Sequence, residues 1–437
     1  MKIYSLEEAK QTILKRKGLH QMDYSPLTLQ RTEEFFGEGV KPAQAVEIIL
    51  RSVEEEGDQA IRKWSKKLDR FDGNEIKIPK SELKSAWEQL DPNLQDAMQT
   101  AASRIRAFHQ RQSIKTWISE DLGGKLGQRI TPIERIGVYV PGGTAPLPSS
   151  LLMSVIPAQV AGVKNIDIAT PPKPAPSILA AAYLCDVNQI YQIGGAQAMA
   201  AFAFGTETVA RVDKIVGAGN LFVTLAKQQL YGVVGLDGLA GPTETMIIAD
   251  HTANPSWVAA DLLAQAEHDV QASAILLTTD PHLAQAVAEE VDRQIEPLGR
   301  KEMIIASIKN AGGIVLVDTL DGAAELANAY GAEHLCLSVD DPELLMGKIN
   351  NAGGFFLGDH SFEVLGDYVA GPSHVMPTGG TARFASPLNV LDFVKISSVI
   401  GLDPQTATQL SKTAGDLADL ENLTAHAAAA RARLEKK

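Results

Sequence analysis

Two side chains of metal-ligand type, Gln265 and His268, stand three positions apart in the stretch Ala-Gln-Ala-Glu-His-Asp. Asn254 and Pro255 predict a helix start upstream, because an Asn side chain caps free backbone N–H groups and proline suits the first turn. On this helix Gln265 and His268 share one face, while the other faces are apolar. Two ligands one turn apart form half of a common metal site, whose other ligands come from elsewhere in the fold. A hydrogen-bonded helix face without a metal is the alternative interpretation.

Glu333 and His334 are adjacent at the start of an apolar run, residues 335–339, that predicts a strand. Side chains alternate across a strand, so the two groups can point to different parts of one site. Imidazole transfers protons near neutral pH, and a carboxylate can deprotonate water. A histidine at a strand edge with a carboxylate nearby is the structural alternative. Cys336 and Cys185 are expected to be buried structural thiols rather than nucleophiles.

Four further titratable residues complete the candidate site: Asp367, His374, Glu421 and His426. Glu421 and His426 are too far apart around a continuous helix to share a face, so a helix break at Thr424 is required. Together with Gln265 and His268, these residues can provide two imidazoles, a carboxylate and an amide as ligands of one divalent ion. That set of ligand types favours zinc, although no spacing in the chain matches an established zinc motif.

Glycine-rich loops follow several short apolar runs in the first half of the chain. Strands that end in such loops and lead into helices indicate a parallel α/β sheet, where ligands bind at the carboxyl ends of the strands. The loops carry Thr144, Gln197 and Asn220, which favours a nucleotide or a phosphate-bearing ligand. The turn at 217–219, with Asp237 about twenty residues on, lacks the third glycine of a dinucleotide fingerprint. The expected strands are 136–140, 166–169, 189–193 and 214–216.

A second α/β unit is expected from about Met246, where strands and helices alternate again. The helical residues before it are expected to pack beside this second unit, because neither has another obvious cover. The fold class is therefore α/β, with two Rossmann-like parallel-sheet domains, a helical N-terminal arm and a C-terminal helical tail. The expected boundaries are 1–28 for the arm, 29–136 with 244–386 for the main domain carrying the metal and catalytic residues, 137–243 for the second domain and 387–437 for the tail.

The composition restricts the classes of partner. The chain has 437 residues, 45% hydrophobic and 21% charged, which allows two or more domains with ample core. A net charge of -13 argues against nucleic acid or an anionic membrane as the main partner. Two cysteines favour a reducing compartment, and the charged N-terminus lacks a signal-peptide apolar segment, so a cytoplasmic protein is expected. The uncharged run 136–163 contains prolines that argue against a membrane helix.

Short motifs occur in order over nearly the whole length of the chain. They are Gly137–Gly143, Gly194–Ala198, Gly217–Asn220, Ala240–Glu244, Ala264–His268, Glu333–Leu335, Gly366–Tyr368, His374–Thr378 and Leu423–His426. Through this series the chain resembles the histidinol dehydrogenase family. The resemblance implies an NAD-dependent, zinc-containing homodimer that oxidises L-histidinol to the aldehyde and then to L-histidine. These are the last two steps of histidine biosynthesis, and they consume two NAD in succession.

The resemblance also implies a role for each matching position. Gln265, His268 and Asp367 correspond to zinc ligands of one subunit, and His426 corresponds to the ligand from the other subunit. His334 corresponds to the general base, and Glu333 to the residue that activates water for the second oxidation. The implied substrate positions are Thr243, Gln265, His268, His334, Asp367, His374, Glu421 and His426, and the implied NAD positions are Tyr139, Gln197 and Asn220.

Three residues depart from the usual pattern of the family. Ala218 and Ala332 stand where proline is usual, and Thr243 stands where serine is usual. Thr243 keeps the hydroxyl, but its methyl group narrows the pocket. A paralogous zinc- and NAD-dependent dehydrogenase of another small polar amino alcohol or diol is therefore the alternative function. A non-enzymatic metal- or nucleotide-binding module is the third hypothesis.

Overall fold

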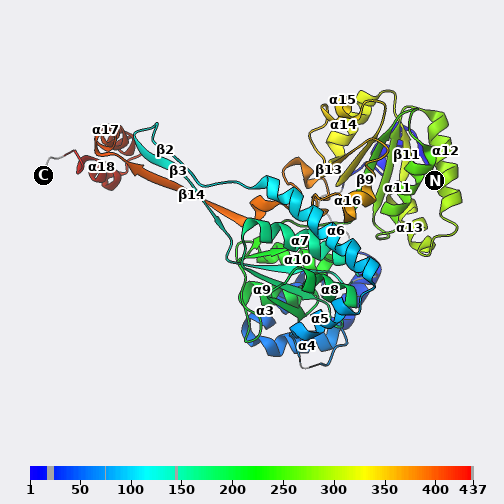
Figure 1. Ribbon diagram of the computed structural model, residues 1–437, viewed down its shortest axis with the longest axis horizontal. Helices are drawn as coiled ribbons and strands as arrows, with labels where there is room; N and C mark the ends of the chain where they lie inside the picture. Colours follow the sequence, from blue (N-terminus) through cyan, green and yellow to red (C-terminus); the bar gives the residue numbers. More distant parts are fainter. Residues whose placement is uncertain (17–23, 74, 143–145, 435–437) are drawn as a thin grey trace.

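The computed structural model describes residues 1–16, 24–73, 75–142 and 146–434. Two parallel sheets, one of six and one of five strands, form the body of the molecule, and a three-stranded antiparallel sheet forms a projecting arm (Figure 1). The expected α/β class, with two parallel-sheet units, a helix near the N-terminus and helices at the C-terminus, is confirmed. None of the described helices is both long and apolar enough to cross a lipid bilayer.

The six-stranded sheet has the order β1-β11-β10-β9-β12-β13, and every neighbouring pair is parallel. Its inner strands are continuous apolar runs, because helices cover both faces. One face packs on α11, α12 and α13, and the other on α1, α14 and α15. The bounds are β1 Ile3–Tyr4, α1 Leu6–Gln11, β9 Glu244–Ala249, α11 Pro255–Ala266, β10 Ser273–Thr278, α12 Pro281–Gln294, α13 Lys301–Ala311, β11 Gly313–Leu316, α14 Leu320–Tyr330, β12 His334–Ser338, α15 Pro342–Met346, β13 Gly354–Leu357 and α16 Glu363–Tyr368.

The five-stranded sheet has the order β6-β5-β4-β7-β8 and is also parallel throughout. The chain runs outward from β4 to β6 on one side and from β7 to β8 on the other. The strand order therefore reverses between β4 and β7, where a doubly wound sheet opens a crevice for ligands. The bounds are β4 Arg135–Tyr139, α7 Pro148–Ala161, β5 Asn165–Thr170, α8 Pro176–Leu184, β6 Gln189–Gln192, α9 Gly195–Phe204, β7 Lys214–Val216, α10 Leu221–Leu230 and β8 Gly235–Leu236.

The helices between residues 42 and 109 cover the five-stranded sheet. The expectation that they pack beside the second unit is wrong for this segment. α3 and α4 share one hydrophobic core with α9 and α10, and α5 and α6 share another with α7 and α8. Their apolar faces thus pack on the helices that flank the two sides of the five-stranded sheet. The bounds are α2 Pro26–Phe36, α3 Pro42–Glu56, α4 Asp58–Leu68, α5 Lys80–Glu88, α6 Pro92–His109 and the 3-10 helix η2 Gln110–Gln112.

The arm combines two segments that are distant in the sequence. β14 pairs antiparallel with β3 over its full length, from Val394 opposite Pro132 to Leu402 opposite Gly124. The two C-terminal helices sit at the far end of this ribbon, away from both parallel sheets (Figure 1). The expected helical tail is confirmed by two C-terminal helices, whereas β2 and β3 were not anticipated. The bounds are β2 Trp117–Ser119, β3 Gly124–Pro132, η3 Thr381–Arg383, η4 Val390–Phe393, β14 Val394–Leu402, α17 Pro404–Leu420 and α18 Thr424–Arg431.

Two local features bring the candidate residues to one place. Asn254 caps α11 as expected, since its Oδ1 accepts a hydrogen bond from Ser256 N at 3.0 Å. α11 follows β9 and runs back along the parallel sheet, so its last turn lies at the edge where the strands begin. The segment 237–243 leads from the end of β8 to the start of β9. The carboxyl edge of the five-stranded sheet is therefore linked directly to the amino edge of the six-stranded sheet.

Candidate active site

His334 is the first residue of β12 and is buried at the amino edge of the six-stranded sheet. Its Nδ1 lies 3.3 Å from the carbonyl oxygen of Glu244. Its Nε2 has no hydrogen-bond partner among the described residues and lies 3.7 Å from Asp367 Oδ1. A ring whose Nδ1–H donates to a carbonyl keeps Nε2 as the nitrogen that can accept a proton. This geometry suits a general base.

The pKa of His334 reflects opposing influences. Burial lowers it, but the nearby carboxylates raise it more, so the result is about 10. Glu363 has the largest raising effect, followed by Glu333 and Asp367. Because Asp367 contributes to this raised pKa, any cation bound to Asp367 would bring the pKa of His334 down toward that of a base.

Glu333 is buried directly beside the histidine. Its Oε2 accepts hydrogen bonds from the Thr243 hydroxyl at 2.5 Å and from Glu244 N at 3.0 Å, and it lies 3.7 Å from His334 Nδ1. Burial raises its pKa to about 7, although His334 and these donors oppose the rise. A carboxylate with a pKa near neutrality can take a proton from water and release it again.

Glu363 is a buried carboxylate that the sequence analysis missed. It accepts a hydrogen bond from the Thr245 hydroxyl and lies 4.0 Å from His334 Nδ1. Burial raises its pKa to about 7. Its position four residues before Asp367, on the same short helix α16, is the sequence signal that pointed to it.

Three of the expected zinc positions gather at this edge. Gln265 is fully buried, and its Nε2 donates to Thr243 Oγ1 at 3.1 Å, while its Oε1 has no partner in the part of the chain that the structure describes. Burial lowers the pKa of His268, partly offset by the negative charge of Asp367. Burial raises the pKa of Asp367, but His334 and two other histidines lower it by a larger amount, so the net shift is downward. No group of three or more His, Cys, Asp or Glu side chains in the described part of the chain is placed to hold a metal.

His374 ties this cluster to the other sheet. Its Nδ1 lies 2.8 Å from the Asp367 carbonyl oxygen, and its Nε2 lies 3.0 Å from Ser150 Oγ on α7. Burial lowers its pKa, although Asp367 raises it in part. A neutral ring fixed from both sides at the boundary between the sheets can contact a substrate without carrying charge.

Glu421 and His426 are not brought to the cluster within this chain. Both are exposed on the C-terminal helices, which Figure 1 shows at the far end of the arm from α11 and α16. The expected helix break is present, since α17 ends at Leu420 and Asn422 has a left-handed φ of 59°. α18 begins at Thr424, with Leu423 as its N-cap.

Tyr139, Gln197 and Asn220 line one pocket of about 380 Å³ at the carboxyl edge of the five-stranded sheet. The Tyr139 hydroxyl accepts from Gly195 N at 3.1 Å, and burial raises its pKa to about 12, so it stays protonated. Asn220 Oδ1 caps α10 through Phe222 N at 3.0 Å. The three positions that the family resemblance assigned to NAD therefore share one pocket.

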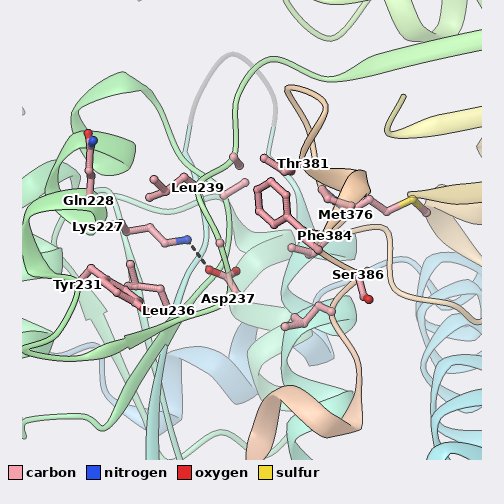
Figure 2. Close-up of a pocket in the computed structure, with 17 residues that line it drawn as sticks. Lys227, Gln228, Tyr231, Leu236, Asp237, Leu239, Met376, Thr381, Phe384 and Ser386 are labelled. Atoms are coloured by element: carbon pink, nitrogen blue, oxygen red, sulfur yellow. Dashed lines mark hydrogen bonds and ion pairs between the residues drawn. The ribbon is translucent and has the colours of Figure 1, made fainter. Parts of the chain in front are cut away.

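A second cavity, of about 440 Å³, lies beside the same sheet edge between β8 and the segment 375–388 (Figure 2). In it Asp237 accepts from Lys227 Nζ at 2.5 Å and from Gly217 N at 2.7 Å. Asp237 was the acidic residue of the partial dinucleotide fingerprint. Its carboxylate is instead committed to a buried ion pair. None of the expected site residues lines this cavity.

Both cysteines are buried and free, as expected. Burial raises the pKa of Cys185 to about 12 and that of Cys336 well above its usual value. Neither thiol ionises at neutral pH, so neither is an activated nucleophile.

A parallel sheet with a pocket of about 380 Å³ at its carboxyl edge, joined to a second sheet with a buried glutamate–histidine pair, is typical of an α/β dehydrogenase. The chain belongs to the histidinol dehydrogenase family, whose model, described as "Histidinol dehydrogenase", matches residues 37–434. It is 47% identical to histidinol dehydrogenase of Deinococcus radiodurans, over 95% of this chain and 96% of that protein. It is 50% identical to the Thermus thermophilus protein of that name, over 87% of this chain and 91% of the relative. The crystal structure of histidinol dehydrogenase from Elizabethkingia anophelis superposes with a TM-score of 0.91 at 35% identity, covering 99% of this chain and 98% of that chain.

Proposed function

We propose that this protein is an NAD-dependent histidinol dehydrogenase, which oxidises L-histidinol through L-histidinaldehyde to L-histidine in histidine biosynthesis. The observation that carries the proposal is the buried Glu333–His334 pair at the amino edge of the six-stranded sheet. The chain that contains it matches the family over nearly its whole length. The pair supplies a base and a water-activating carboxylate. The cofactor pocket lies on the five-stranded sheet, which the segment 237–243 connects to the sheet that carries the pair. A cytoplasmic location is part of this proposal.

In the first oxidation, His334 takes the hydroxyl proton of the alcohol while the carbinol carbon transfers hydride to NAD. Water then adds to the aldehyde, and Glu333 takes a proton from that water as the hydrate forms. The hydrate loses a second hydride to a second NAD, and the released protons leave through the same two residues. Neither step needs a thiolate, which agrees with the two inert cysteines.

Zinc fits the residues at this edge. Gln265 Oε1 is a fully buried acceptor without a partner, and leaving such an atom unpaired is costly unless something binds it. We propose that Gln265, His268 and Asp367 hold the ion in one subunit, and that a second copy contributes His426. When bound, zinc would hold the nitrogen atoms of the substrate and fix its orientation.

A homodimer with shared sites forms part of this proposal. Glu421 and His426 sit on an arm that carries exposed apolar side chains, among them Ile400 at 75% and Leu420 at 78% exposure. Such a surface is suited to burial against a second copy. Mixing two inactive variants, His426→Asn and Gln265→Ala, is expected to restore activity once subunits exchange. No recovery after exchange is verified by mass spectrometry would rule out shared sites.

Stoichiometry tests the reaction itself. Purified protein with zinc, NAD and L-histidinol is expected to form two NADH for each L-histidinol consumed, with L-histidine as the product. One NADH per alcohol, or no turnover, would overturn the proposal. A panel of other small amino alcohols and diols, assayed in parallel, tests the alternative that Thr243 raised. The Thr243 hydroxyl donates to Glu333 and accepts from Gln265, so it keeps a bridging role despite the added methyl.

A further inference from the structure

The cofactor pocket contains a carboxylate that no motif assigns. Asp69 is the C-cap of α4 and is the one acidic side chain among the described residues that line this pocket. Its Oδ2 accepts a hydrogen bond from Gln197 Nε2 at 2.9 Å. Gln197 is fully buried, so this hydrogen bond fixes the carboxylate from inside the pocket.

Asp69 lies over the carboxyl ends of two neighbouring strands. A Cβ atom placed on Gly194, just after β6, would come within 3.2 Å of Asp69 Oδ1 and 3.5 Å of Pro171 Cα. Pro171 directly follows β5. The carboxylate thus sits above β5 and β6, on one side of the reversal of strand order between β4 and β7.

This is the place where a doubly wound sheet holds the adenosine half of a dinucleotide. In such sheets an acidic residue after the second strand usually accepts hydrogen bonds from the ribose hydroxyls. Here the second strand, β5, ends in Thr170 and is followed by Pro171 and Pro172, so no carboxylate stands there. The first acidic residue after the partial fingerprint, Asp237, is paired with Lys227. Asp69 supplies the missing group from a different part of the chain.

We propose that Asp69 accepts the hydrogen bonds of the adenosine ribose 2′- and 3′-hydroxyls of NAD and excludes the 2′-phosphate of NADP. The inference rests on the proposed use of NAD. It makes Asp69 a specificity-determining residue, because a carboxylate that binds a hydroxyl pair repels a phosphate at the same position. Burial raises the pKa of Asp69 to about 6, partly offset by Gln197, so the group is ionised at the pH of a dehydrogenase assay.

The test uses adenosine 5′-diphosphoribose and its 2′-phosphorylated form as probes, titrated calorimetrically into the full-length protein without L-histidinol. Wild type is expected to bind the first probe and to discriminate against the second. Asp69→Asn keeps the size of the side chain and is expected to weaken the unphosphorylated probe roughly tenfold to a hundredfold, as for the loss of a hydrogen bond to a charged group. It is also expected to reduce the discrimination against the phosphorylated probe.

Two matched variants keep the test interpretable. Asp72→Asn removes an exposed carboxylate from the same loop, outside the pocket, and is expected to bind both probes as wild type does. Asp69→Glu keeps the charge and is expected to retain most of the discrimination. Steady-state assays should show a higher KM for NAD in Asp69→Asn, with kcat at saturating NAD and the KM for L-histidinol unchanged.

Equal binding of both probes by wild type, or unchanged probe binding in Asp69→Asn, would overturn the proposal. A fall in kcat together with loss of the folded-state melting transition in Asp69→Asn would count against it as well, since the residue would then be structural. Probe binding does not require turnover. Failure of the L-histidinol assay would therefore refute the proposed function without deciding the role of Asp69.

Discussion

The two parallel sheets place their functional residues at opposite edges. The five-stranded sheet uses its carboxyl edge, where α9 and α10 begin and residues of their first turns line the pocket. The six-stranded sheet uses its amino edge, where α11 ends beside Gln265 and His268. Helix N-termini favour anions and helix C-termini favour cations. The comparison teaches that one edge is suited to a pyrophosphate and the opposed edge to a cation.

The largest effect should come from removing an expected zinc ligand at the amino edge of the six-stranded sheet. His268→Asn is expected to lose bound zinc and to reduce turnover of L-histidinol to background, because the imidazole donor is gone. Zinc content by atomic emission and NADH formation measure the two losses. His251→Asn, an exposed histidine of the same domain, should change neither. Retention of full zinc in His268→Asn would show that the amino edge is not the metal site.

Removing only the general base should impair catalysis at the amino edge without affecting NAD binding at the carboxyl edge. His334→Asn is expected to reduce kcat by about a hundredfold to ten-thousandfold, the usual contribution of a positioned base, while NAD affinity stays unchanged. Single-turnover NADH formation and NAD titration measure these quantities. A matched substitution at exposed His282 should leave both unaltered. A large loss of NAD affinity in His334→Asn would mean that the two edges do not work independently.

Glu333→Gln should distinguish the two half-reactions. Only aldehyde oxidation requires a proton to be taken from water, so this variant is expected to lose about a hundredfold more activity with the aldehyde than with the alcohol. Assays started from L-histidinol and from L-histidinaldehyde compare the two rates directly. Equal losses in both would argue that Glu333 positions His334 rather than activating water.

The smallest expected effect concerns stability against pH. Burial raises the pKa of Glu363 from 4.5 to about 7, so the folded protein holds a proton there that the unfolded chain has released. The loss of folding stability from ionising this buried carboxyl is absent below about pH 4.5, grows as pH rises and is complete above about pH 7. In chelator-treated protein, Glu363→Gln should therefore flatten the fall of Tm between about pH 5 and about pH 8. An unchanged slope would contradict the burial of an ionisable group there.

Local sequence patterns predicted the elements better than their packing. Alternation of strands and helices, and the Asn254 cap, gave both parallel sheets and the start of α11. The helices between residues 42 and 109 were assigned to the wrong sheet, because an amphipathic helix shows which face is apolar but not which sheet that face meets. The arm strands β2 and β3 were missed, since both are largely solvent-accessible and lack an apolar alternation.

The candidate site was accessible from the sequence only where ligands are close along the chain or lie in a known motif. Gln265 with His268 and Glu333 with His334 are such pairs. Asp69 and Glu363 were missed for a different reason, because each acts on a group that folding alone brings near. Asp69 meets Gln197 across 128 positions, and Thr245 meets Glu363 across 118. Spacing relates Glu363 to Asp367 on α16, but it carries no information about these long-range contacts.

The short connection 237–243 has a mechanical consequence. Its middle is held on both sides, since Thr224 Oγ1 donates to Ala240 O and Gly241 N donates to Thr378 Oγ1. Its last residue, Thr243, donates a hydrogen bond from its hydroxyl to Glu333. These hydrogen bonds tie the segment that leaves the five-stranded sheet to the carboxylate at the edge of the six-stranded sheet, so the two edges are held at a fixed separation.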